Sequence, residues 1–235
     1  MKKPEILVFD VNETMLDLRA LQPHFERLFG DRRVMGEWFG LMLRLSLVAT
    51  VTRAYRPFAE LGRDALVTTA RKHGLEWDTA VPDDILGTML HLPPYPDVIP
   101  ALTQLRDAGY RLVTLTNSAP SAQASQLAHA GLTDFFERQF SVEAVQLFKP
   151  APETYHYAAD QLGVAIHHIR LIAAHDWDVT GAIRAGAQAA FVARPGIILG
   201  GTAETPDIIG TDLLTVANQL LNLPGTSEDA SLIAD

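Results

Sequence analysis

Short apolar runs that stop abruptly in polar residues recur along the chain, with segments of helical apolar spacing between them. The first run, Ile6–Phe9, ends at Asp10 and is followed by short polar residues. Comparable runs begin at Arg111, His168 and Gln188. Uninterrupted apolar runs of this length are typical of strands that are buried on both faces of a parallel sheet. We therefore expect an α/β protein.

Four segments between these runs show helical spacing, and a glycine follows each of them. They are residues 98–108, 119–130, 152–162 and 179–185. Glycine commonly ends helices because it adopts a left-handed backbone without a steric penalty. Strands that alternate with helices predict a doubly wound parallel sheet.

Residues 16–95 break this alternation. They contain helical stretches at 35–55 and 58–73 and no convincing strand, and the proline-rich segment 92–96 closes them with a rigid turn. An all-helical block placed directly after the first strand is expected to cover the carboxyl edge of the sheet. Residues 1–15 and 96–222 would then form the core domain, 16–95 a helical cap domain, and 223–235 a flexible tail.

The composition excludes several classes of protein. The formal net charge of -9 argues against general nucleic-acid binding, which needs a basic surface. The chain has no cysteine, so disulfides, thiol catalysis and cysteine-ligated metals are excluded. No stretch reaches the roughly 18 uninterrupted apolar residues of a membrane span, and the first residues lack a signal-peptide pattern. We therefore expect a cytoplasmic protein that binds neither nucleic acid nor membrane.

Polar residues with complementary chemistry follow the predicted strands. Because the carboxyl ends of parallel strands share one edge of a sheet, we expect Asp10, residues 116–118, Lys149 and residues 175–178 to converge there. A lysine beside several carboxylates keeps a nucleophilic carboxylate ionised and oriented. Hydroxyl and amide side chains, together with free backbone N–H groups at helix starts, suit the binding of an anion.

These motifs, in their order along the chain and with a helical insertion after the first, resemble the haloacid dehalogenase superfamily. The resemblance extends from Ile6 to about Leu221 and is greatest to the type II group, the (S)-2-haloacid dehalogenases. It implies a Rossmann-like core with a helical cap, a small carboxylate substrate, no cofactor and a homodimer. It also implies that Asp10 attacks a substrate carbon, displaces a leaving group and forms an ester, which water then hydrolyses.

The resemblance assigns roles to further residues. Thr14 would support the Asp10 carboxylate, and Lys149 matches the lysine of the third motif. Asp178 corresponds to an acid that positions or activates water. Substrate contacts are expected from the core residues Thr116, Asn117, Tyr155 and Trp177 and from the cap residue Phe58.

Several positions depart from the type II pattern. Asn12 stands where the family has an aromatic residue. Phe39, which follows Trp38, stands where the family has an arginine that helps to receive the halide. Ala173 and His175 replace the serine and asparagine of the fourth motif. We still expect Asn12 and Phe39 to line the substrate site, where they would alter recognition of the leaving group.

His175 has two interpretations. A histidine with the reference pKa of about 6.5, beside Asp176 and Asp178, suits a base for the hydrolytic water. A structural histidine that is hydrogen-bonded to Asp178 is the alternative. The sequence leaves both interpretations open.

Two other activities remain alternatives to halide displacement. The same nucleophile could open the ring of an azetidine-2-carboxylate-type imino acid, where a ring nitrogen leaves from carbon. A Mg²⁺-dependent phosphatase needs an acid at position 12 to protonate the leaving alcohol and another at 173 for the metal, but the chain has Asn12 and Ala173. We therefore predict a metal-independent hydrolase that attacks C2 of a small 2-substituted carboxylate, with halide as the default leaving group.

Overall fold

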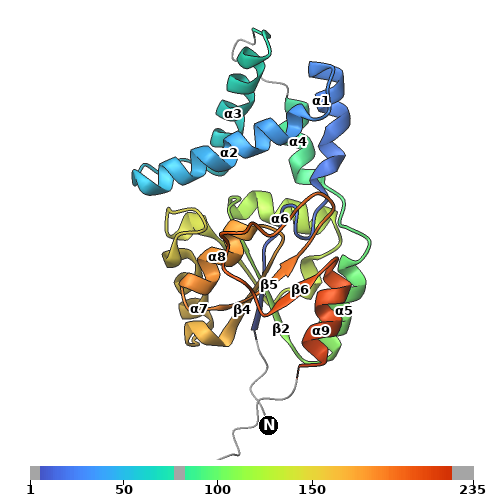
Figure 1. Ribbon diagram of the computed structural model, residues 1–235, viewed down its shortest axis with the longest axis vertical. Coiled ribbons are helices and arrows are strands. Elements are labelled where there is room, and N and C mark those ends of the chain that lie inside the picture. The colour runs from blue at the N-terminus through green and yellow to red at the C-terminus, as the bar shows by residue number, and fades with distance from the viewer. Residues whose placement is uncertain (1–5, 77–82, 224–235) are drawn as a thin grey trace, which may run out of the picture.

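The core of the protein is a six-stranded, fully parallel sheet with the strand order β3-β2-β1-β4-β5-β6 (Figure 1). It is seen in a computed structural model that describes residues 6–76 and 83–223. The strands are β1 (Ile6–Phe9), β2 (Arg111–Thr116), β3 (Arg138–Ser141), β4 (Ile169–Ala173), β5 (Gln188–Val192) and β6 (Ile208–Gly210). The predicted doubly wound, Rossmann-like sheet is confirmed.

The two central strands explain why the apolar runs were recognisable. Every residue of β1 and β4 is buried, since each strand has a neighbour on both sides and helices on both faces. Ile6 pairs with Arg111 of β2 on one side and with Ile169 of β4 on the other. The edge strands β3 and β6 were not predicted, because β3 has Phe140 as its only apolar residue and β6 is only three residues long.

Helices cover both faces of the sheet. They are α5 (Val98–Asp107), α6 (Pro120–His129), α7 (Pro152–Leu162), α8 (Asp176–Arg184) and α9 (Leu213–Leu221). The helix α5 packs against α9, and α7 packs against α8 (Figure 1). The helix α8 begins three residues before the predicted start at 179, so Asp176 and Asp178 lie in its first turn. Acidic side chains stabilise a helix at this end because they interact favourably with the positive end of the helix dipole.

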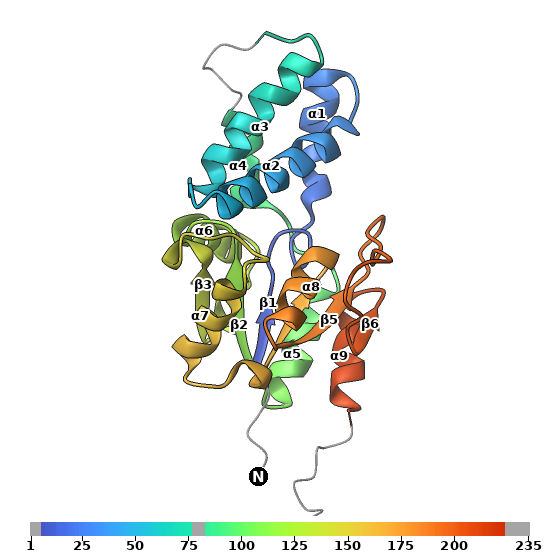
Figure 2. The same cartoon turned by 60° about the vertical axis from the view of Figure 1, so that its left-hand side comes forward.

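A second helical layer lies beyond the carboxyl ends of the strands (Figures 1 and 2). It consists of α1 (Gln22–Phe29), α2 (Val34–Val51), α3 (Phe58–Lys72) and α4 (Asp83–Thr88). The buried indole of Trp38 joins α2 to α3, because its N–H donates to the carbonyl of Gly62 at 2.9 Å. The limits of 16 and 95 for a cap domain stay predictions, and of the predicted tail, residues 224–235 lie outside the described residues.

The helix α2 is, among the described helices, the one long and apolar enough to cross a membrane by length and composition alone. However, 44% of this stretch is buried inside the molecule, chiefly on the side that faces α3. Core helices of globular domains meet the same criterion, so this feature is weak evidence for a membrane.

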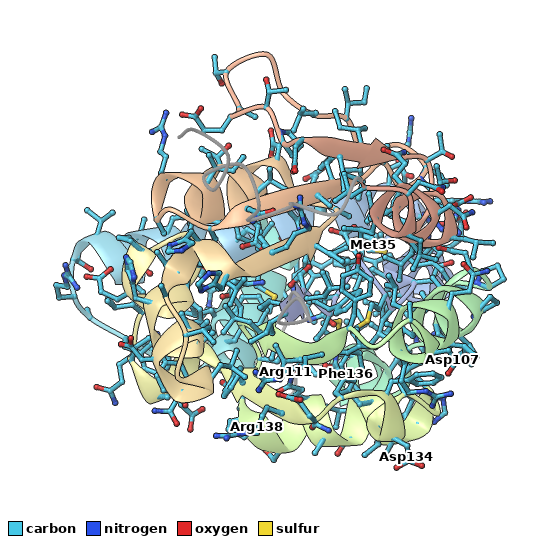
Figure 3. The ribbon with its side chains drawn as sticks, turned by 90° about the horizontal axis from the view of Figure 1, so that it is seen from below. Met35, Asp107, Arg111, Asp134, Phe136 and Arg138 are labelled. Carbon is cyan, nitrogen blue, oxygen red and sulfur yellow. The ribbon has the colours of Figure 1, made fainter. Side chains whose placement is uncertain are left out.

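The amino ends of the strands form the opposite edge of the sheet. Figure 3 views the molecule from below and labels Arg111 and Arg138, the first residues of β2 and β3. Arg111 pairs with Glu137, and Phe136 packs edge-on against Phe9 of β1, with ring centroids 5.8 Å apart. The ion pair lies at the amino edge of the sheet, whereas Phe9 is the last residue of β1. The strand order reverses between β1 and β4, and open α/β sheets bind ligands at the carboxyl side of that reversal.

Candidate active site

Two neighbouring strands deliver charged side chains to the point where the strand order reverses. Asp10 follows β1 directly, and its backbone N–H donates to the carbonyl of Ile172 in β4 at 3.0 Å. The sheet ladder therefore extends one residue beyond β1 and fixes the direction of the Asp10 side chain. His175 follows β4 and is the residue before α8. The side chains of Asp10 and His175 meet at this edge of the sheet, as predicted, with Nδ1 of His175 3.4 Å from Oδ2 of Asp10.

Lys149 connects two buried carboxylates. Its Nζ lies 2.7 Å from Oδ1 of Asp10 and 2.7 Å from Oδ2 of Asp178, and it also donates to the carbonyl of Leu115 at 3.0 Å. An ammonium group has three hydrogens, so each has an acceptor here. The side chains of Lys149 and Asp178 are fully buried, and that of Asp10 is 7% exposed. This ion-pair chain fixes Asp10 in one orientation.

Thr14 holds the other oxygen of Asp10. Its hydroxyl accepts a hydrogen bond from the N–H of Ala174 at 2.9 Å and donates to Oδ2 of Asp10 at 2.7 Å. Because a hydroxyl has a single hydrogen, the bond from Ala174 leaves that hydrogen for Asp10. The predicted support of Asp10 by Thr14 thus has a geometric basis.

Arg194 anchors the turn that carries Thr14, although sequence reasoning did not assign it to the site. Its Nε and Nη2 donate to the carbonyl of Thr14 at 3.0 and 2.7 Å. The same guanidinium pairs with Asp97 at 2.7 Å and lies 4.0 Å from the ring centroid of Tyr95. The one sequence signal for Arg194 was its position just after an apolar run, two residues beyond the end of β5. Arg194 is almost fully buried, so it stabilises the turn from within.

The charges of the site determine its protonation states. Burial alone would raise the pKa of Asp10, but Lys149 and His175 outweigh burial and hold that pKa well below its usual range. Burial would lower the pKa of Lys149, yet the two carboxylates beside it raise the pKa. Burial raises the pKa of Asp178, and its pairing with Lys149 does not offset this rise. Asp10 is therefore ionised at neutral pH, which a carboxylate nucleophile requires.

Tyr155 lies behind Asp178. Its Oη donates to Oδ1 of Asp178 at 2.6 Å and also lies 3.1 Å from the carbonyl oxygen of the same residue. Burial and the charge of Asp178 raise the pKa of Tyr155 well above its usual value, so the phenol stays a neutral donor. This geometry makes Tyr155 a support for Asp178, and the predicted contact with substrate stays a prediction.

His175 is held between two carboxylates. Its Nε2 lies 2.8 Å from Oε2 of Glu13, and its Nδ1 lies 3.4 Å from Oδ2 of Asp10. Burial would lower the pKa of His175, but Asp10 and Glu13 together raise it to about 10. The expected structural alternative, a hydrogen bond from His175 to Asp178, is wrong, because the Asp178 carboxylate is bonded to Lys149 and Tyr155. A protonated imidazole at neutral pH favours a donor role over the predicted base role.

The predicted anion-binding residues form one connected loop. Thr116 accepts a hydrogen bond from the N–H of Ser118 at 3.2 Å. Asn117 accepts one from the N–H of Lys149 at 3.0 Å, and Asn12 donates to the hydroxyl of Ser118 at 3.3 Å. Thr116 and Asn117 therefore shape the loop next to Asp10. Ser118, which was expected at this edge of the sheet without an individual role, is buried there.

Both the nitrogen and the oxygen of the Asn12 side-chain amide form hydrogen bonds. Besides the bond to Ser118, its Oδ1 accepts a hydrogen bond from Nε2 of Gln126 at 3.0 Å. The same Nε2 donates to the carbonyl of Met89 at 2.8 Å, in the short helix η2 (Met89–His91) that follows α4. Asn12 thus helps to connect the sheet to the helical insertion, a role that no local sequence signal for Gln126 had indicated.

Aromatic rings from both layers border the site. Trp177 stacks on His175, with ring centroids 4.9 Å apart, and Phe39 of α2 lies 6.3 Å from the same imidazole. Phe58 of α3 packs against Phe148 at 5.6 Å. The predicted residues Phe39, Phe58 and Trp177 therefore lie at the contact between the helical insertion and the carboxyl edge of the sheet.

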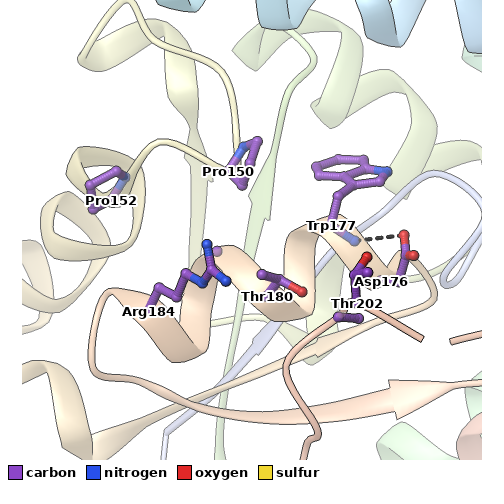
Figure 4. A pocket seen from close by; sticks show the side chains of 9 residues that line it. Pro150, Pro152, Asp176, Trp177, Thr180, Arg184 and Thr202 are labelled. Atoms are coloured by element: carbon purple, nitrogen blue, oxygen red, sulfur yellow. Dashed lines mark hydrogen bonds between the residues drawn. The ribbon is translucent and has the colours of Figure 1, made fainter. Parts of the chain in front are cut away.

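A cleft of about 560 Å³ lies on the outer side of α8 (Figure 4). It is lined by Pro150, Pro152, Asp176, Trp177, Thr180, Gly181, Arg184, Thr202 and Ala203. Trp177 thus borders this cleft and also contacts His175, whereas Asp10 and Lys149 do not line it. Asp176 accepts a hydrogen bond from the backbone N–H of Trp177 at 2.7 Å, shown dashed in Figure 4, so this carboxylate stabilises the first turn of α8.

The donor set of the site is a poor match for a divalent cation. Within residues 6–76 and 83–223, no group of three histidine, aspartate or glutamate side chains has an arrangement suited to a metal. The carboxylates of Asp10 and Asp178 are instead joined by the ammonium group of Lys149, which lies 2.7 Å from each. Lys149 therefore supplies the positive charge that such a pair of carboxylates requires.

The fold and the site define an α/β enzyme with a buried carboxylate–lysine centre where the order of a parallel sheet reverses. The model of the haloacid dehalogenase-like hydrolase family matches residues 4–186, and the chain belongs to this family. The predicted family and the predicted hydrolase activity are thereby confirmed.

Similar proteins are (S)-2-haloacid dehalogenases. That of Pseudomonas sp. strain YL is 28% identical over 224 residues, which cover 94% of this chain and 97% of the relative. That of Xanthobacter autotrophicus is 32% identical over 190 residues, covering 80% and 74%. The solved structure of the Xanthobacter autotrophicus L-2-haloacid dehalogenase with covalently bound chloropropionic acid has a TM-score of 0.87 and 27% identity, covering 94% of this chain and all of that one.

Proposed function

We propose that this hydrolase removes halide from C2 of a small 2-halocarboxylate without a metal, through an ester on Asp10. The observation that carries the proposal is the ion-pair chain from Asp10 through Lys149 to Asp178, which keeps the Asp10 carboxylate ionised and oriented. The similar dehalogenases named above, one of them with covalently bound chloropropionic acid, support the substrate class.

The reaction has two steps. In the first, an oxygen of Asp10 bonds to C2 while the carbon–halogen bond breaks, and halide leaves with the electron pair of that bond. In the second, water attacks Cγ of Asp10, and the bond between Cγ and the ester oxygen breaks. The products are the 2-hydroxy acid, the regenerated carboxylate and one proton.

Binding is assigned to the residues around Asp10. The hydroxyl and amide groups of Thr116, Asn117 and Asn12 line the loop where a substrate carboxylate would be held. The rings of Phe39 and Trp177 would enclose the alkyl part and the leaving group. An apolar enclosure excludes water in the first step, which strengthens the electrostatic interactions of the site.

Ring opening of an azetidine-2-carboxylate-type imino acid is a second candidate. The observation that favours it is His175, whose raised pKa keeps a proton available near the reacting oxygen, and a departing ring nitrogen needs a proton. A Mg²⁺-dependent phosphatase has less support. Asn12 cannot protonate a leaving alcohol, and Lys149 already joins the carboxylates of Asp10 and Asp178.

The decisive experiment is a single turnover in ¹⁸O-labelled water with excess enzyme. The substrates are (S)-2-chloropropionate, azetidine-2-carboxylate and a phosphate monoester, each tested with added Mg²⁺ and, in parallel, with chelator. We expect chloride release and one ¹⁸O atom in the peptide that contains Asp10, because water attacks the enzyme carbonyl. The Asp10→Asn variant is expected to release no chloride. Label only in the product alcohol would contradict the ester mechanism, and phosphate release that chelator abolishes would favour the phosphatase.

We also infer a homodimer. The support is an apolar patch on α2, where Leu47, Val48 and Val51 are 41%, 53% and 82% exposed. Apolar patches of this kind mark association surfaces in many proteins. Sedimentation equilibrium would test this inference, and a monomer at all concentrations up to 100-fold above the assay range would contradict it.

A further inference from the structure

We propose that His175, held in place by Glu13, donates a hydrogen bond that stabilises the oxyanion on Oδ2 of Asp10 while water hydrolyses the ester. This inference rests on the proposed function. It assigns Oδ1 of Asp10 to the attack on the substrate carbon and Oδ2 to the oxyanion that forms during ester hydrolysis. His175 would be a catalytic residue, because its Nδ1 faces the reacting carboxylate. Glu13 would be a positioning residue that acts through His175.

The two oxygens of Asp10 have different surroundings. Oδ1 receives the ammonium group of Lys149 at 2.7 Å. Oδ2 receives the hydroxyl of Thr14 at 2.7 Å and also faces Nδ1 of His175 at 3.4 Å. Two donors that converge on one oxygen form the arrangement that stabilises a developing negative charge. Oδ1 is therefore assigned as the attacking atom, and Oδ2 becomes the carbonyl oxygen of the ester.

The Nδ1 atom of His175 lacks a hydrogen-bond partner of good geometry, although it is buried. A buried donor without a partner is costly, so its retention calls for a reason. When water attacks Cγ of Asp10, this carbon becomes tetrahedral and Oδ2 moves out of the carboxylate plane with a negative charge. A donor that is too distant in the resting enzyme can shorten its hydrogen bond at that moment.

Glu13 holds the imidazole from the other side. Its Oε2 lies 2.8 Å from Nε2 of His175, so the proton on Nε2 points to Glu13 and the second proton of the imidazolium points to Asp10. The backbone of Glu13 has a φ of 61°, a left-handed conformation that costs a residue with a side chain about 1 kcal/mol or more. The turn after β1 thus carries a strained residue whose side chain reaches the histidine beside Asp10.

The charge of His175 is set by few groups. Glu13 and Asp10 face the ring from β1 and its following turn, and they favour its protonated form. On its own helix, the Asp178 carboxylate is bonded to Lys149, and Asp176 bonds a backbone N–H. The helix α2 contributes the uncharged ring of Phe39, and α8 adds the ring of Trp177.

The step balances without a proton leaving His175. The water oxygen bonds to Cγ, the carbonyl electron pair moves to Oδ2, and the imidazolium of His175 and the hydroxyl of Thr14 donate hydrogen bonds to this oxyanion. The tetrahedral intermediate then collapses and the bond from Cγ to Oδ1 breaks. One proton of the water goes to the departing product oxygen, and the other is released to solvent when Asp10 ionises.

The test separates the two steps kinetically. A rapid-quench experiment with (S)-2-chloropropionate follows chloride release as the first step and decay of the Asp10 ester, by mass spectrometry, as the second, from pH 6 to pH 10.5. In His175→Gln we expect ester decay to slow by about 100-fold or more, the loss typical for one oxyanion donor, while chloride release changes less than about threefold. Glu13→Gln keeps an acceptor for His175 but removes the negative charge. In this variant, fast ester decay should be lost at a pH at least one unit lower than in the parent.

The sign of the pH dependence decides between donor and base. A donor must be protonated, so ester decay falls as pH rises through the pKa of His175. A base must be neutral, so ester decay would rise through that pKa, and Glu13→Gln would speed decay at neutral pH; this result would overturn the inference. Unchanged ester decay in His175→Gln and Glu13→Gln would also overturn it. If the parent enzyme forms no ester, the proposed function fails and this inference fails with it.

A matched control is available on the helical insertion. Glu37 and His73 form the same kind of pair, with Oε2 and Nε2 3.1 Å apart, but their side chains are 55% and 33% exposed and neither contacts Asp10. Glu37→Gln should leave both steps and their pH dependence unchanged. Imidazole NMR titration of the folded variants gives a second readout, because Glu13→Gln should lower the pKa of His175 even where turnover is too slow to measure.

Discussion

Hydrogen-bond capacity determines the arrangement of individual residues in the candidate site. The ammonium group of Lys149 uses its three hydrogens on Asp10, Asp178 and the carbonyl of Leu115. Asp178 receives Lys149 on Oδ2 and Tyr155 on Oδ1. Lys149 therefore positions Asp10, Asp178 positions Lys149, and Tyr155 positions Asp178. Removal of the donor on Tyr155 should change the orientation of Asp10.

Tyr155→Phe tests this dependence. The variant keeps the ring but removes the donor to Asp178, which leaves a buried carboxylate oxygen unpaired and should cost about 1–3 kcal/mol of unfolding free energy. We also expect kcat to fall about 10-fold, since Asp178 helps to place Lys149. Urea unfolding and steady-state kinetics measure both effects. Tyr157→Phe, on the same helix, is the control, because Tyr157 contacts Phe140 through its ring. Equal effects of the two variants would contradict the role of Tyr155.

The helix α8 packs closely against α7 and against the loop that carries Lys149. This helix supplies Trp177 and Asp178 and packs against the segment that carries Lys149. A Cβ atom on Gly181 would lie 2.4 Å from Cβ of Pro150 and 2.7 Å from Oη of Tyr155. Only glycine therefore allows α8 to lie this close to α7 and the lysine loop.

Gly181→Ala should separate these elements. Alanine is the better helix former by about 1 kcal/mol, yet overpacking should outweigh this and destabilise the protein by about 1–3 kcal/mol. We expect kcat to fall at least about 10-fold, because Lys149 and Asp178 would move apart. The control is Gly36→Ala in α2, where a Cβ meets no atom within 4 Å. Thermal unfolding should show Gly36→Ala as neutral or stabilising. A neutral Gly181→Ala would refute the close-packing argument.

At the scale of the whole molecule, charges from distant parts of the chain make stability depend on pH. His175 has a pKa of about 10 in the folded protein, against 6.5 as its ordinary value, because folding brings Glu13 and Asp10 to it. A histidine whose pKa is raised on folding stabilises the folded state fully below pH 6.5. This contribution declines above that pH and is lost once pH exceeds about 10.

We therefore expect His175→Gln to lose stability relative to the parent at pH 6 but little at pH 10. The full contribution is at most about 5 kcal/mol, from 3.5 units at about 1.4 kcal/mol each. Urea unfolding at pH 6, 8 and 10 measures the difference between parent and variant, in which lysine and tyrosine titrations cancel. A difference that is constant across this range would show that His175 is not charged in the folded protein.

The local pattern of residues accounts for much of the fold. The buried strands β1 and β4 were recognisable because both faces require apolar residues, and four of the five core helices, α5 to α8, because glycine marks their ends. The edge strand β3 was not recognisable because an edge strand needs few apolar residues, and β6 because three residues are too short to show a pattern. The start of α8 was misplaced because Asp176 and Asp178 stabilise a helix start through charge rather than through apolar spacing.

The sequence by itself determined the sheet, the helical insertion and the charged residues at the strand ends, because these follow from local periodicity and from motifs at fixed places. Tertiary structure decided which side chains meet and which protons they hold. Glu13 and His175 are 162 positions apart, and Arg194 lies 180 positions from Thr14. Only the folded chain places such groups within hydrogen-bonding distance in a buried environment, where neighbouring charges shift a pKa by several units.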